Sequence, residues 1–278
     1  MPLPDIAGSY AIFGLLCLSL TACAVHRPAV STDADQDATP SLVQPVASTA
    51  EERSWGRSLG NVSGHIQAVP VWEHYRLPGK EATQYAFVRT GDADGRVSVQ
   101  ASSAASASML RARMAVMPEQ MGHFHFSWKV ASLIEGADLG VRESDDAPAR
   151  VVLAFDGDRS RFTTREWAMS ELAHTITGEE LPYATLMYVW CNQRPVGTVI
   201  VHPRSSRIRA IVVETGPARV GQWTAYNRDV KADFERAFGE PPAKLTGVAL
   251  MTDSDNTRQQ AKAWYGPLSF EQATASAR

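Results

Sequence analysis

The sequence predicts a mainly β protein, an antiparallel β-sandwich of the jelly-roll type with two short helices. Three observations lead to this fold class. From Val69 onward the chain is a series of short apolar runs bounded by turn residues. The run HFHFSWKV at 123–130 alternates apolar and polar residues, as a half-buried strand does. The chain shows no βαβ alternation and no internal repeat, so a parallel sheet is not expected.

The remaining strands are expected at regular intervals along the chain. They span 69–75, 83–90, 96–102, 107–114, 149–155, 184–191, 196–202, 208–214, 221–230, 245–252 and 264–271. Helices are expected at 163–176 and 229–239. The second helix spaces three apolar side chains four residues apart and ends at Gly239, a residue suited to the left-handed conformation that closes many helices.

The N-terminus has the pattern of a processing signal. The apolar run AIFGLLCLSL at 11–20 is too short to span a bilayer and leads directly into Leu20-Thr21-Ala22-Cys23. This resembles the lipobox of bacterial lipoproteins, in which a cysteine follows small residues and carries the lipid. The segment before the run lacks Lys and Arg, which departs from the usual signal peptide. We expect a signal peptide over 1–22 and lipidation of Cys23.

The rest of the chain divides by composition. Residues 23–66 are rich in Ala, Ser, Thr, Pro and Asp, which predicts a flexible tether. The β-sandwich is expected over 67–272 and a short tail over 273–278. Ala24 follows the lipidated cysteine, and an Asp is absent there, which in such lipoproteins favours the outer membrane. The expected location is therefore the cell envelope, anchored by lipid and facing the periplasm.

The charge of the chain argues against a nucleic-acid ligand, and its cysteine content argues against a disulfide bond. The formal net charge is −3 and 21% of residues are charged, with basic residues spread along the chain, so a nucleic acid is not an expected ligand. Cys17 leaves with the signal peptide and Cys23 is lipidated. Only Cys191 then remains, so no disulfide is expected within the mature chain.

The stretch LMTDSDNTRQQAKAWYG at 250–266 is the densest run of chemically capable side chains. Asp253 and Asp255, with Asn256 beside them, offer hard oxygen ligands suited to Ca²⁺. No glycine or third donor completes an EF-hand pattern, and no cofactor is otherwise expected. The structural alternative is a polar turn between two strands, with side chains bonding nearby backbone N–H groups, or a turn of helix through TRQQAKA.

A second acidic group precedes the strand at 149–155. Asp145 and Asp146 are adjacent, and Arg150 is the neutralising partner nearest in sequence. If Asp146 met Asp253 or Asp255 in space, the pair would resemble the two carboxylates of a glycosidase. Searches for a nucleophile elbow, a phosphate-binding loop or a dinucleotide motif find none.

Aromatic side chains suggest sugar stacking. Aromatic faces pack on sugar rings, so exposed Trp or Tyr residues on a sandwich favour carbohydrate binding. The aromatic residues that come into question are Trp72, Tyr75, Tyr183, Tyr188, Trp190, Trp223, Trp264 and Tyr265. Of these, Tyr188, Trp190, Trp264 and Tyr265 are the candidate ligand-binding residues.

Five blocks of the chain resemble one family. They are WKVASLIEGAD, DDAPARVVLAF, LPYATLMYVWCN, RDVKADFERAFGEPP and GVALMTDSDNTRQQAKAWYGPLSF. In order and style they are similar to the bacterial family of domain of unknown function 3047, over about residues 69 to 271. The resemblance implies a periplasmic or lipoprotein-like protein with no assigned activity. It also implies a sandwich similar to carbohydrate-binding modules, which often hold a structural calcium.

The expected function is non-catalytic binding of a glycan or another envelope component by a lipid-anchored protein. One alternative is a polysaccharide or cell-wall hydrolase that uses Asp146 with Asp253 or Asp255. Another is a structural or assembly-partner lipoprotein, which would present a large apolar patch.

Overall fold

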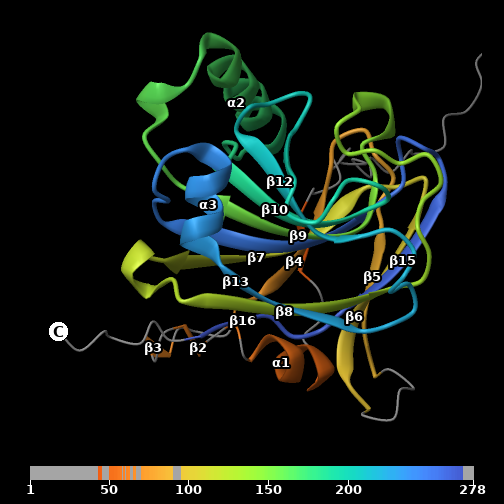
Figure 1. Cartoon of the computed structure of the whole chain (residues 1–278). Helices are drawn as coiled ribbons and strands as arrows, with labels where there is room; N and C mark the ends of the chain where they lie inside the picture. The colour runs from red at the N-terminus through yellow and green to blue at the C-terminus, as the bar shows by residue number, and fades with distance from the viewer. Residues whose placement is uncertain are drawn as a thin grey trace, which may run out of the picture. The chain divides into compact units, whose positions relative to one another are not determined.

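Two β-sheets packed face to face form the body of the protein in the computed structural model (Figure 1). The structure describes residues 43–45, 50–57, 59, 61–62, 65–66, 70–89 and 95–271. The chain divides into two units, Met1–Thr39 and Pro40–Arg278, and every described residue belongs to the second. The predicted signal peptide, Cys23 and the predicted tail lie outside the described residues.

The first sheet has eight strands in the order β1-β4-β7-β14-β9-β10-β12-β11. These strands are β1 (Val43–Pro45), β4 (Trp72–Arg76), β7 (Ser108–Val116), β14 (Leu245–Asp253), β9 (Ala147–Phe155), β10 (Ala184–Cys191), β12 (Ile208–Thr215) and β11 (Val199–Val201). All neighbours are antiparallel except β10 and β12, which run parallel.

The second sheet has the strand order β13-β8-β15-β6-β5, with β16 also paired to β8. These strands are β13 (Thr224–Asp229), β8 (His123–Val130), β15 (Gln260–Tyr265), β6 (Val97–Ala104), β5 (Gln84–Arg89) and β16 (Ser269–Phe270). All of their pairings are antiparallel. A two-residue pair, β2 (Asn61–Val62) and β3 (His65–Ile66), stands apart from both sheets.

The predicted fold class is confirmed: the described chain is mainly β and forms a two-sheet sandwich. The parallel pair of β10 and β12 differs from the expected all-antiparallel arrangement. In the sequence, the short β11 (Val199–Val201) comes between β10 and β12. It pairs antiparallel with β12 on the side away from β10, so the chain forms the edge strand first and then returns to place β12 beside β10, parallel to it. The segment predicted as one last strand is two: β15 begins earlier, at Gln260, and β16 is separate.

Both predicted helices are present, and each begins at a capping residue. In α2 (Thr164–Thr177) the Thr163 side chain accepts from the Glu166 N–H while Glu166 accepts from the Thr163 N–H, a reciprocal capping box. In α3 (Val230–Phe238) Asp229 caps the start and Gly239, with φ of 71°, closes the end.

The two helices occupy different places. Helix α2 lies over the outer side of the eight-stranded sheet (Figure 1), where Glu179, just after the helix, binds Arg111 of β7 through two hydrogen bonds of 2.7 Å. Helix α3 connects β13 to β14 and closes one end of the interior. Its Phe234 ring packs 4.7 Å from Phe155, and its Asp233 accepts from the buried Tyr188 hydroxyl.

A third helix, α1 (Ala50–Gly56), lies within the segment predicted to be a flexible tether. Its Trp55 is only 1% exposed and reaches between the sheets, with its ring 4.9 Å from Trp72 and 5.8 Å from Phe87. The Trp55 indole N–H donates to the Tyr265 carbonyl at 3.0 Å. The tether prediction is therefore wrong for this stretch, because burying one large aromatic side chain outweighs the disorder that a polar composition favours.

The core between the sheets is built from alternate residues of the strands, those whose side chains point inward. The apolar residues Phe124, Phe126, Trp128 and Val130 of β8 are all at most 2% exposed, as the alternation in sequence predicts. A smaller apolar group, which includes Val152, Met187 and Val189, lies on the outer side of the eight-stranded sheet. Strands β9 and β10 are thus covered on both sides, which explains why their sequences are continuous runs of apolar residues without alternation.

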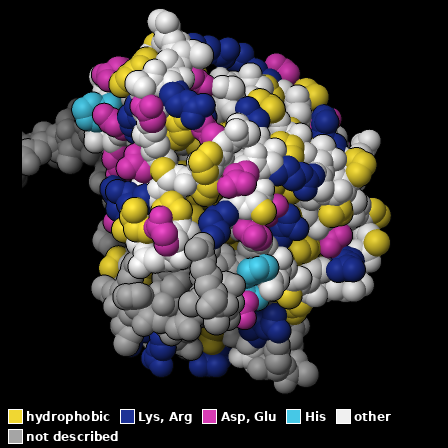
Figure 2. All heavy atoms as spheres, turned by 60° about the vertical axis from the view of Figure 1, so that its left-hand side comes forward, with side chains coloured by type: hydrophobic (Ala, Val, Ile, Leu, Met, Phe, Trp, Pro, Cys, Tyr) yellow, Lys and Arg dark blue, Asp and Glu magenta, His cyan; other side chains and the backbone are white. Residues whose placement is uncertain are grey.

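The surface carries mixed charges. On the face shown in Figure 2 basic and acidic side chains are interspersed, and no field of a single sign covers the described residues there. Helix α2 turns Trp167, Leu172 and Ile176 outward, at 40%, 60% and 54% exposure, and buries only Glu166 and Ser170. None of the described helices is long and apolar enough to cross a membrane.

Candidate functional site

The loop that carries Asp253 and Asp255 joins the two sheets. Asp253 is the last residue of β14 in the eight-stranded sheet, and Gln260 is the first of β15 in the other. Ser254 fixes the turn: its N–H donates to the Ser106 carbonyl at 3.1 Å and its hydroxyl donates to the Gln259 carbonyl at 2.8 Å. The prediction of a polar turn between two strands of the sandwich is confirmed, and the alternative of a helical turn through TRQQAKA is wrong.

Arg150 and Asp253 form a buried, bidentate ion pair inside this junction. The Arg150 Nε atom donates to Asp253 Oδ1 at 2.8 Å, and Nη2 donates to Oδ2 at 2.6 Å. Their side chains are 4% and 3% exposed. The Arg150 guanidinium also donates to the Asp145 carbonyl oxygen at 2.9 Å and to its carboxylate at 3.3 Å. The predicted neutralisation of Asp145 by Arg150 is therefore present, and Asp253 is the stronger partner.

Burial and the charge of Arg150 act in opposite directions on the pKa values of Asp253 and Asp145. Burial raises the pKa of Asp253 to about 7, although the neighbouring Arg150 cation pulls it down. Burial also tends to raise the pKa of Asp145, but the Arg150 charge and a hydrogen bond from His202 outweigh it and hold the pKa below its usual value. His202 Nε2 lies 2.8 Å from the Asp145 carboxylate, and its Nδ1 accepts from the Arg204 N–H at 3.1 Å.

The other polar residues of the junction also have partners. Asp146 accepts from the backbone N–H groups of Asn256 at 3.2 Å and Thr257 at 2.6 Å. The Asn256 side-chain amide donates to the Asp145 carbonyl at 3.1 Å. Asp255 forms an ion pair with Lys80, from the loop between β4 and β5. The junction thus clamps the segment before β9 onto the turn after β14.

Three carboxylates of the junction come close enough to share a cation. One oxygen each from Asp146, Asp253 and Asp255 lies within 4.8 Å of the others. However, Arg150 already binds both oxygens of Asp253, Lys80 binds Asp255, and Asp146 holds two backbone N–H groups. A Ca²⁺ ion would have to share these carboxylate oxygens with the existing donors or displace them. Two of the three carboxylates thus have a cation of the protein as partner, and the third accepts from two backbone N–H groups.

The same geometry does not fit glycoside hydrolysis. The two carboxyls of such a site stand roughly 5 to 9.5 Å apart and face a cleft that admits a sugar and a water. Asp146 and Asp253 are each 2% exposed. The Asp255 side chain is 10% exposed and paired with Lys80, and none of the three lines either of the two hollows described below. The sequence raised this pairing only as a condition; the structure brings the aspartates together, with Asp146 and Asp253 in a packed interior.

Three of the four predicted stacking residues are buried. Tyr188, Trp190 and Tyr265 are all 0% exposed, so their predicted role as sugar-stacking residues is wrong. Tyr188 stacks on Phe126 at 5.3 Å, and the Tyr265 hydroxyl donates to the Met251 carbonyl at 2.7 Å. The continuous apolar run of β10 conceals which of its residues face the interior, and that is why the sequence could not exclude them.

Trp264 is the exception and lies on the outer side of the six-stranded sheet. Its neighbours Tyr265 and Ala263 are 0% exposed and point into the core, so alternation turns Trp264 outward, where it is half-buried. In the strand register Trp264 lies beside Lys129 of β8 on one side and Gln100 of β6 on the other. Its indole N–H donates to the Gln100 side-chain oxygen at 3.2 Å.

A second tryptophan extends this arrangement. Trp223 comes directly before β13, whose first residue Thr224 pairs with Trp128 of β8. The Lys129 Nζ atom is 5.0 Å from the Trp264 ring centre and 5.5 Å from that of Trp223. We call the cross-strand set Trp223, Lys129, Trp264, Gln100 and Ala86 the outer row.

Sequence reasoning did not single out most of the outer row. The alternation of HFHFSWKV does place Lys129 on the polar face of its strand. Which strands lie next to it, and in which register, depends on pairings between residues far apart in the chain. The outer row therefore emerges only from the assembled sheet.

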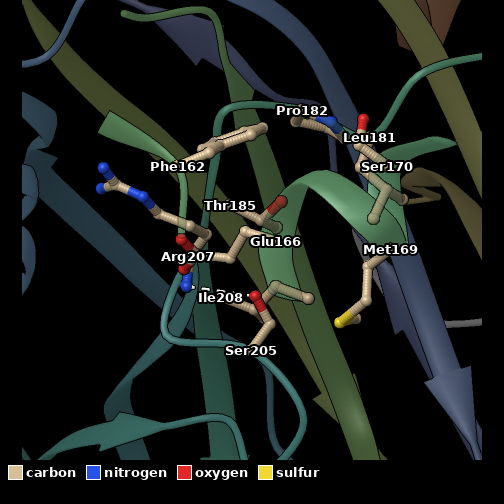
Figure 3. A pocket seen from close by; sticks show the side chains of 10 residues that line it. All are labelled: Phe162, Glu166, Met169, Ser170, Leu181, Pro182, Thr185, Ser205, Arg207 and Ile208. Carbon is tan, nitrogen blue, oxygen red and sulfur yellow. Dashed lines mark hydrogen bonds between the residues drawn. The ribbon is translucent and has the colours of Figure 1, made fainter. Parts of the chain in front are cut away.

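Two hollows lie elsewhere on the described surface. A cavity of about 40 Å³ lies under α2, between Phe162, Glu166 and Arg207 (Figure 3). It has room for a few water molecules and is far smaller than the roughly 300 to 1,000 Å³ of a typical ligand pocket.

The second hollow measures about 560 Å³ and lies at the ends of β7 and β9. It is lined by Met117, Pro118, Glu119, Asp156, Gly157, Asp158, Ala243 and Lys244. Its acidic residues hold the local backbone: Asp156 accepts from the Gly157 N–H and Asp158 from the Ser160 N–H. Hydrogen bonds from Ser160 lower the pKa of Asp158 below its usual value.

Comparison with known proteins identifies a family model. Residues 70–269 match the model described as "Protein of unknown function (DUF3047)". No curated protein matches the chain.

Among solved structures, a xyloglucanase domain of NopAA, a type three effector from Sinorhizobium fredii, in complex with cellobiose, aligns with a TM-score of 0.37 and 6% identity. That alignment covers 72% of this chain and 93% of that one. A cellulase derived from Cel12A of Rhodothermus marinus aligns with a TM-score of 0.37 and 10% identity, over 77% of this chain and 94% of that one.

Proposed function

The chain belongs to the DUF3047 family of proteins of unknown function, and we propose that it binds a glycan on the outer row of its six-stranded sheet. The observation that carries the proposal is the pair of tryptophans at one level of the sheet. Lys129 separates Trp223 from Trp264, so two indole rings are presented along a single cross-strand line. Sugar rings stack on indole faces, and successive residues of an extended glycan would meet successive rings.

Polar side chains around the rings supply the directional contacts that sugar hydroxyls need. The Gln100 amide lies on the outer row, and Ser102 and Gln84 lie in the next row of the sheet. Gln84 and Ala86 are exposed, so the row opens toward β5. Amide and hydroxyl groups both donate and accept, which suits the alternating donors and acceptors of a glycan.

The test is retardation of the chain from residue 24 onward, which includes every described residue, in native gels that contain soluble polysaccharides. A glycan array selects the polysaccharides. The variant Trp264→Ala should weaken binding about 30-fold, the effect of removing an aromatic anchor worth about 2 kcal/mol. The matched control is Trp167→Ala, which removes an exposed tryptophan from α2 on the other sheet. Equal retardation of both variants, or no binding to any glycan, would sink the proposal.

We further propose that the protein acts at the cell envelope through a lipid on Cys23. The apolar run at 11–20 followed by Leu20-Thr21-Ala22-Cys23 supports this address. Expression in a bacterial host with radiolabelled palmitate checks it: the wild-type chain should carry label and sediment with outer membranes, and Cys23→Ser should do neither. Label retained on Cys23→Ser would contradict the anchor without bearing on the glycan site.

A further inference from the structure

We infer that helix α2 docks on the surface of the lipid bilayer that carries the anchor on Cys23. The inference goes beyond glycan binding. It rests on the proposed anchor for the choice of a bilayer as the partner, and on the geometry of α2 for the contact itself. The observation that carries it is the orientation of this helix, which turns apolar side chains away from the body of the protein.

The side of α2 that faces the protein is polar. Its buried residues are Glu166 and Ser170, and Glu166 accepts a hydrogen bond from the Ser206 hydroxyl, in the loop between β11 and β12. The apolar residues Leu172 and Ile176 are exposed instead. A helix packed on a core normally buries its apolar side and exposes its polar side. Helix α2 therefore has the opposite orientation, with an apolar surface that the described part of the chain leaves uncovered.

The exposed apolar residues of α2 form one stripe. Ala168, Leu172 and Ile176 follow one another at intervals of four residues, so their side chains lie on the same side of the helix, and all three are exposed. Trp167 lies outside this stripe, with its ring 5.6 Å from that of Phe162. A helix with such a stripe lies in the plane of a bilayer surface, where the boundary between headgroups and acyl chains removes the stripe from water.

The charges near the stripe fit a bilayer that contains anionic lipids. Arg165 lies in the first turn of α2, and Arg204 lies in the loop that Ser206 ties to Glu166. Both arginines are exposed, and neither forms an ion pair with a carboxylate of the described residues. Glu171 is the one exposed carboxylate on α2. Two cations and one carboxylate thus border the stripe, and anionic headgroups attract the excess positive charge.

The chain enters the fold close to the end of α2. The first described strand, β1, pairs with β4, which pairs with β7. Arg111 of β7 binds Glu179, which directly follows the Gly178 that closes α2. Two strand spacings, about 10 Å, therefore separate β1 from the strand on which α2 ends. Residues 24–42 lie between Cys23 and β1, and a chain of that length spans at most about 70 Å. A lipid on Cys23 would hold the stripe near the bilayer.

An anchor makes a weak contact sufficient for docking. A second contact of an already anchored molecule is intramolecular, with an effective concentration on the order of millimolar. Burial of the stripe then favours one orientation of the protein over free tumbling. Helix α2 lies over the outer side of the eight-stranded sheet, and the outer row lies on the outer side of the other sheet (Figure 1). In the docked orientation the outer row faces away from the bilayer and stays open to a glycan.

The test holds the chain from residue 24 onward on vesicles through an N-terminal hexahistidine tag and a nickel-chelating lipid, so it does not depend on lipidation. The vesicles consist of phosphatidylethanolamine and phosphatidylglycerol, with doxyl-labelled lipids that quench a fluorophore at the bilayer surface. Cys191 is the only cysteine from residue 24 onward and is buried, so a thiol-reactive fluorophore on Ala168→Cys reports on the stripe. The variant Ala225→Cys places the same label at an exposed alanine of β13, in the other sheet.

We expect the label at position 168 to be quenched at least about threefold more strongly than the label at position 225, because only the first reaches the headgroup boundary. Adding Leu172→Ser/Ile176→Ser to Ala168→Cys should lower the quenching to the level at position 225. The matched control Val141→Ser/Val196→Ser also removes two exposed aliphatic side chains, from the loops before β9 and after β10. Since α2 connects the opposite ends of these strands, the control should leave the quenching unchanged.

Three results would overturn the inference. Equal quenching at the two labelled positions would mean that the tethered protein has no preferred side toward the bilayer. Quenching at position 168 that survives Leu172→Ser/Ile176→Ser would mean that the stripe does not make the contact. A doubled mass of the unlabelled chain in sedimentation, lost in that variant, would mean that a second copy covers the stripe. Glycan retardation and palmitate labelling of Cys23 are measured independently, so failure here is distinct from failure of either proposal above. Circular dichroism of each variant confirms that it remains folded.

Discussion

Arg150 and Asp253 face each other across the junction of β9 and β14 with two parallel hydrogen bonds, of 2.8 and 2.6 Å, although 103 residues separate them in the chain. Because Asp253 begins the turn after β14 and accepts from the Ala147 N–H, and Arg150 also holds Asp145, this pair ties the end of β14 to the loop before β9. A pair that is almost completely buried depends on both members, since removing one leaves an uncompensated charge away from water.

Replacing Arg150 with Met should therefore lower the free energy of unfolding by about 3 to 5 kcal/mol at pH 8, where Asp253 is ionised. Urea unfolding measures it. The double variant Arg150→Met/Asp253→Leu should recover part of the loss, because it removes the stranded carboxylate. The control Lys244→Met breaks an exposed pair with Asp156 and should cost less than about 0.5 kcal/mol. Additive losses in the double variant would show that the pair is not coupled.

The pH dependence of stability should reveal the raised pKa of Asp253. A carboxyl whose pKa rises on folding stabilises the folded state below its unfolded pKa, near 3.8, and loses that contribution as pH rises through its folded pKa of about 7. The unfolding free energy of the wild type, taken relative to Asp253→Asn, should thus fall between about pH 4 and 7. The difference is on the order of a few kcal/mol. A difference that stays flat or grows with pH would mean that Asp253 is ionised throughout.

Helix α1 should contribute to the stability of the sandwich. Replacing Trp55 with Ala removes a side chain that is 1% exposed and its hydrogen bond to the Tyr265 carbonyl, at an expected cost of about 3 to 5 kcal/mol. Urea unfolding and limited trypsin digestion, which would open sites at Arg53 and Arg57, measure it. Trp167→Ala, at 40% exposure, should cost less than about 1 kcal/mol. If both variants lower the free energy of unfolding by a similarly small amount, α1 does not contribute to the stability of the sandwich and belongs to the flexible tether.

Substitutions at the neighbouring residues Trp264 and Tyr265 should have different effects: one should weaken glycan binding and the other should lower stability. The Tyr265 hydroxyl donates to the Met251 carbonyl and accepts from the Arg150 N–H, so Tyr265→Phe should cost about 1 to 3 kcal/mol and leave glycan retardation unchanged. Trp264→Ala should do the reverse. Thermal unfolding and affinity electrophoresis on both variants make the comparison. If Tyr265→Phe loses glycan binding at a temperature where it is folded, the binding site lies at the junction and not at the outer row.

Calcium should have little effect on stability. Arg150 and Lys80 already contact two of the three clustered carboxylates, and the third holds two backbone N–H groups, so a cation gains little by displacing them. We expect the same unfolding midpoint in millimolar CaCl₂ and in EDTA. A ligand that binds the folded state raises its stability by mass action, so a midpoint several degrees higher in CaCl₂, abolished by Asp146→Asn, would establish a metal site.

Local sequence patterns predicted most of the elements. The strand at 123–130 matches β8 residue for residue, because its alternation fixes both its ends and its buried side. Helix α3 lies within the expected range 229–239, and Gly239 closes it as expected. The alternative of a helical turn through TRQQAKA is wrong: residues from Gln260 onward form β15, since pairing with β6 overrides the helix propensity of a short segment.

The sequence by itself determined the layered β architecture, the position of the Asp-rich turn and the polar side of β8, because alternation and turn chemistry act over a few residues. Tertiary structure alone decided which aromatics reach the surface. Tyr188 and Trp190 lie in a strand covered on both sides, where no alternation marks the inner face, whereas Trp264 gains its neighbours Lys129 and Gln100 through strand register. It also decided that Asp253 meets a guanidinium and not solvent. A local pattern fixes the two faces of a strand, but what lies against each face depends on the rest of the chain.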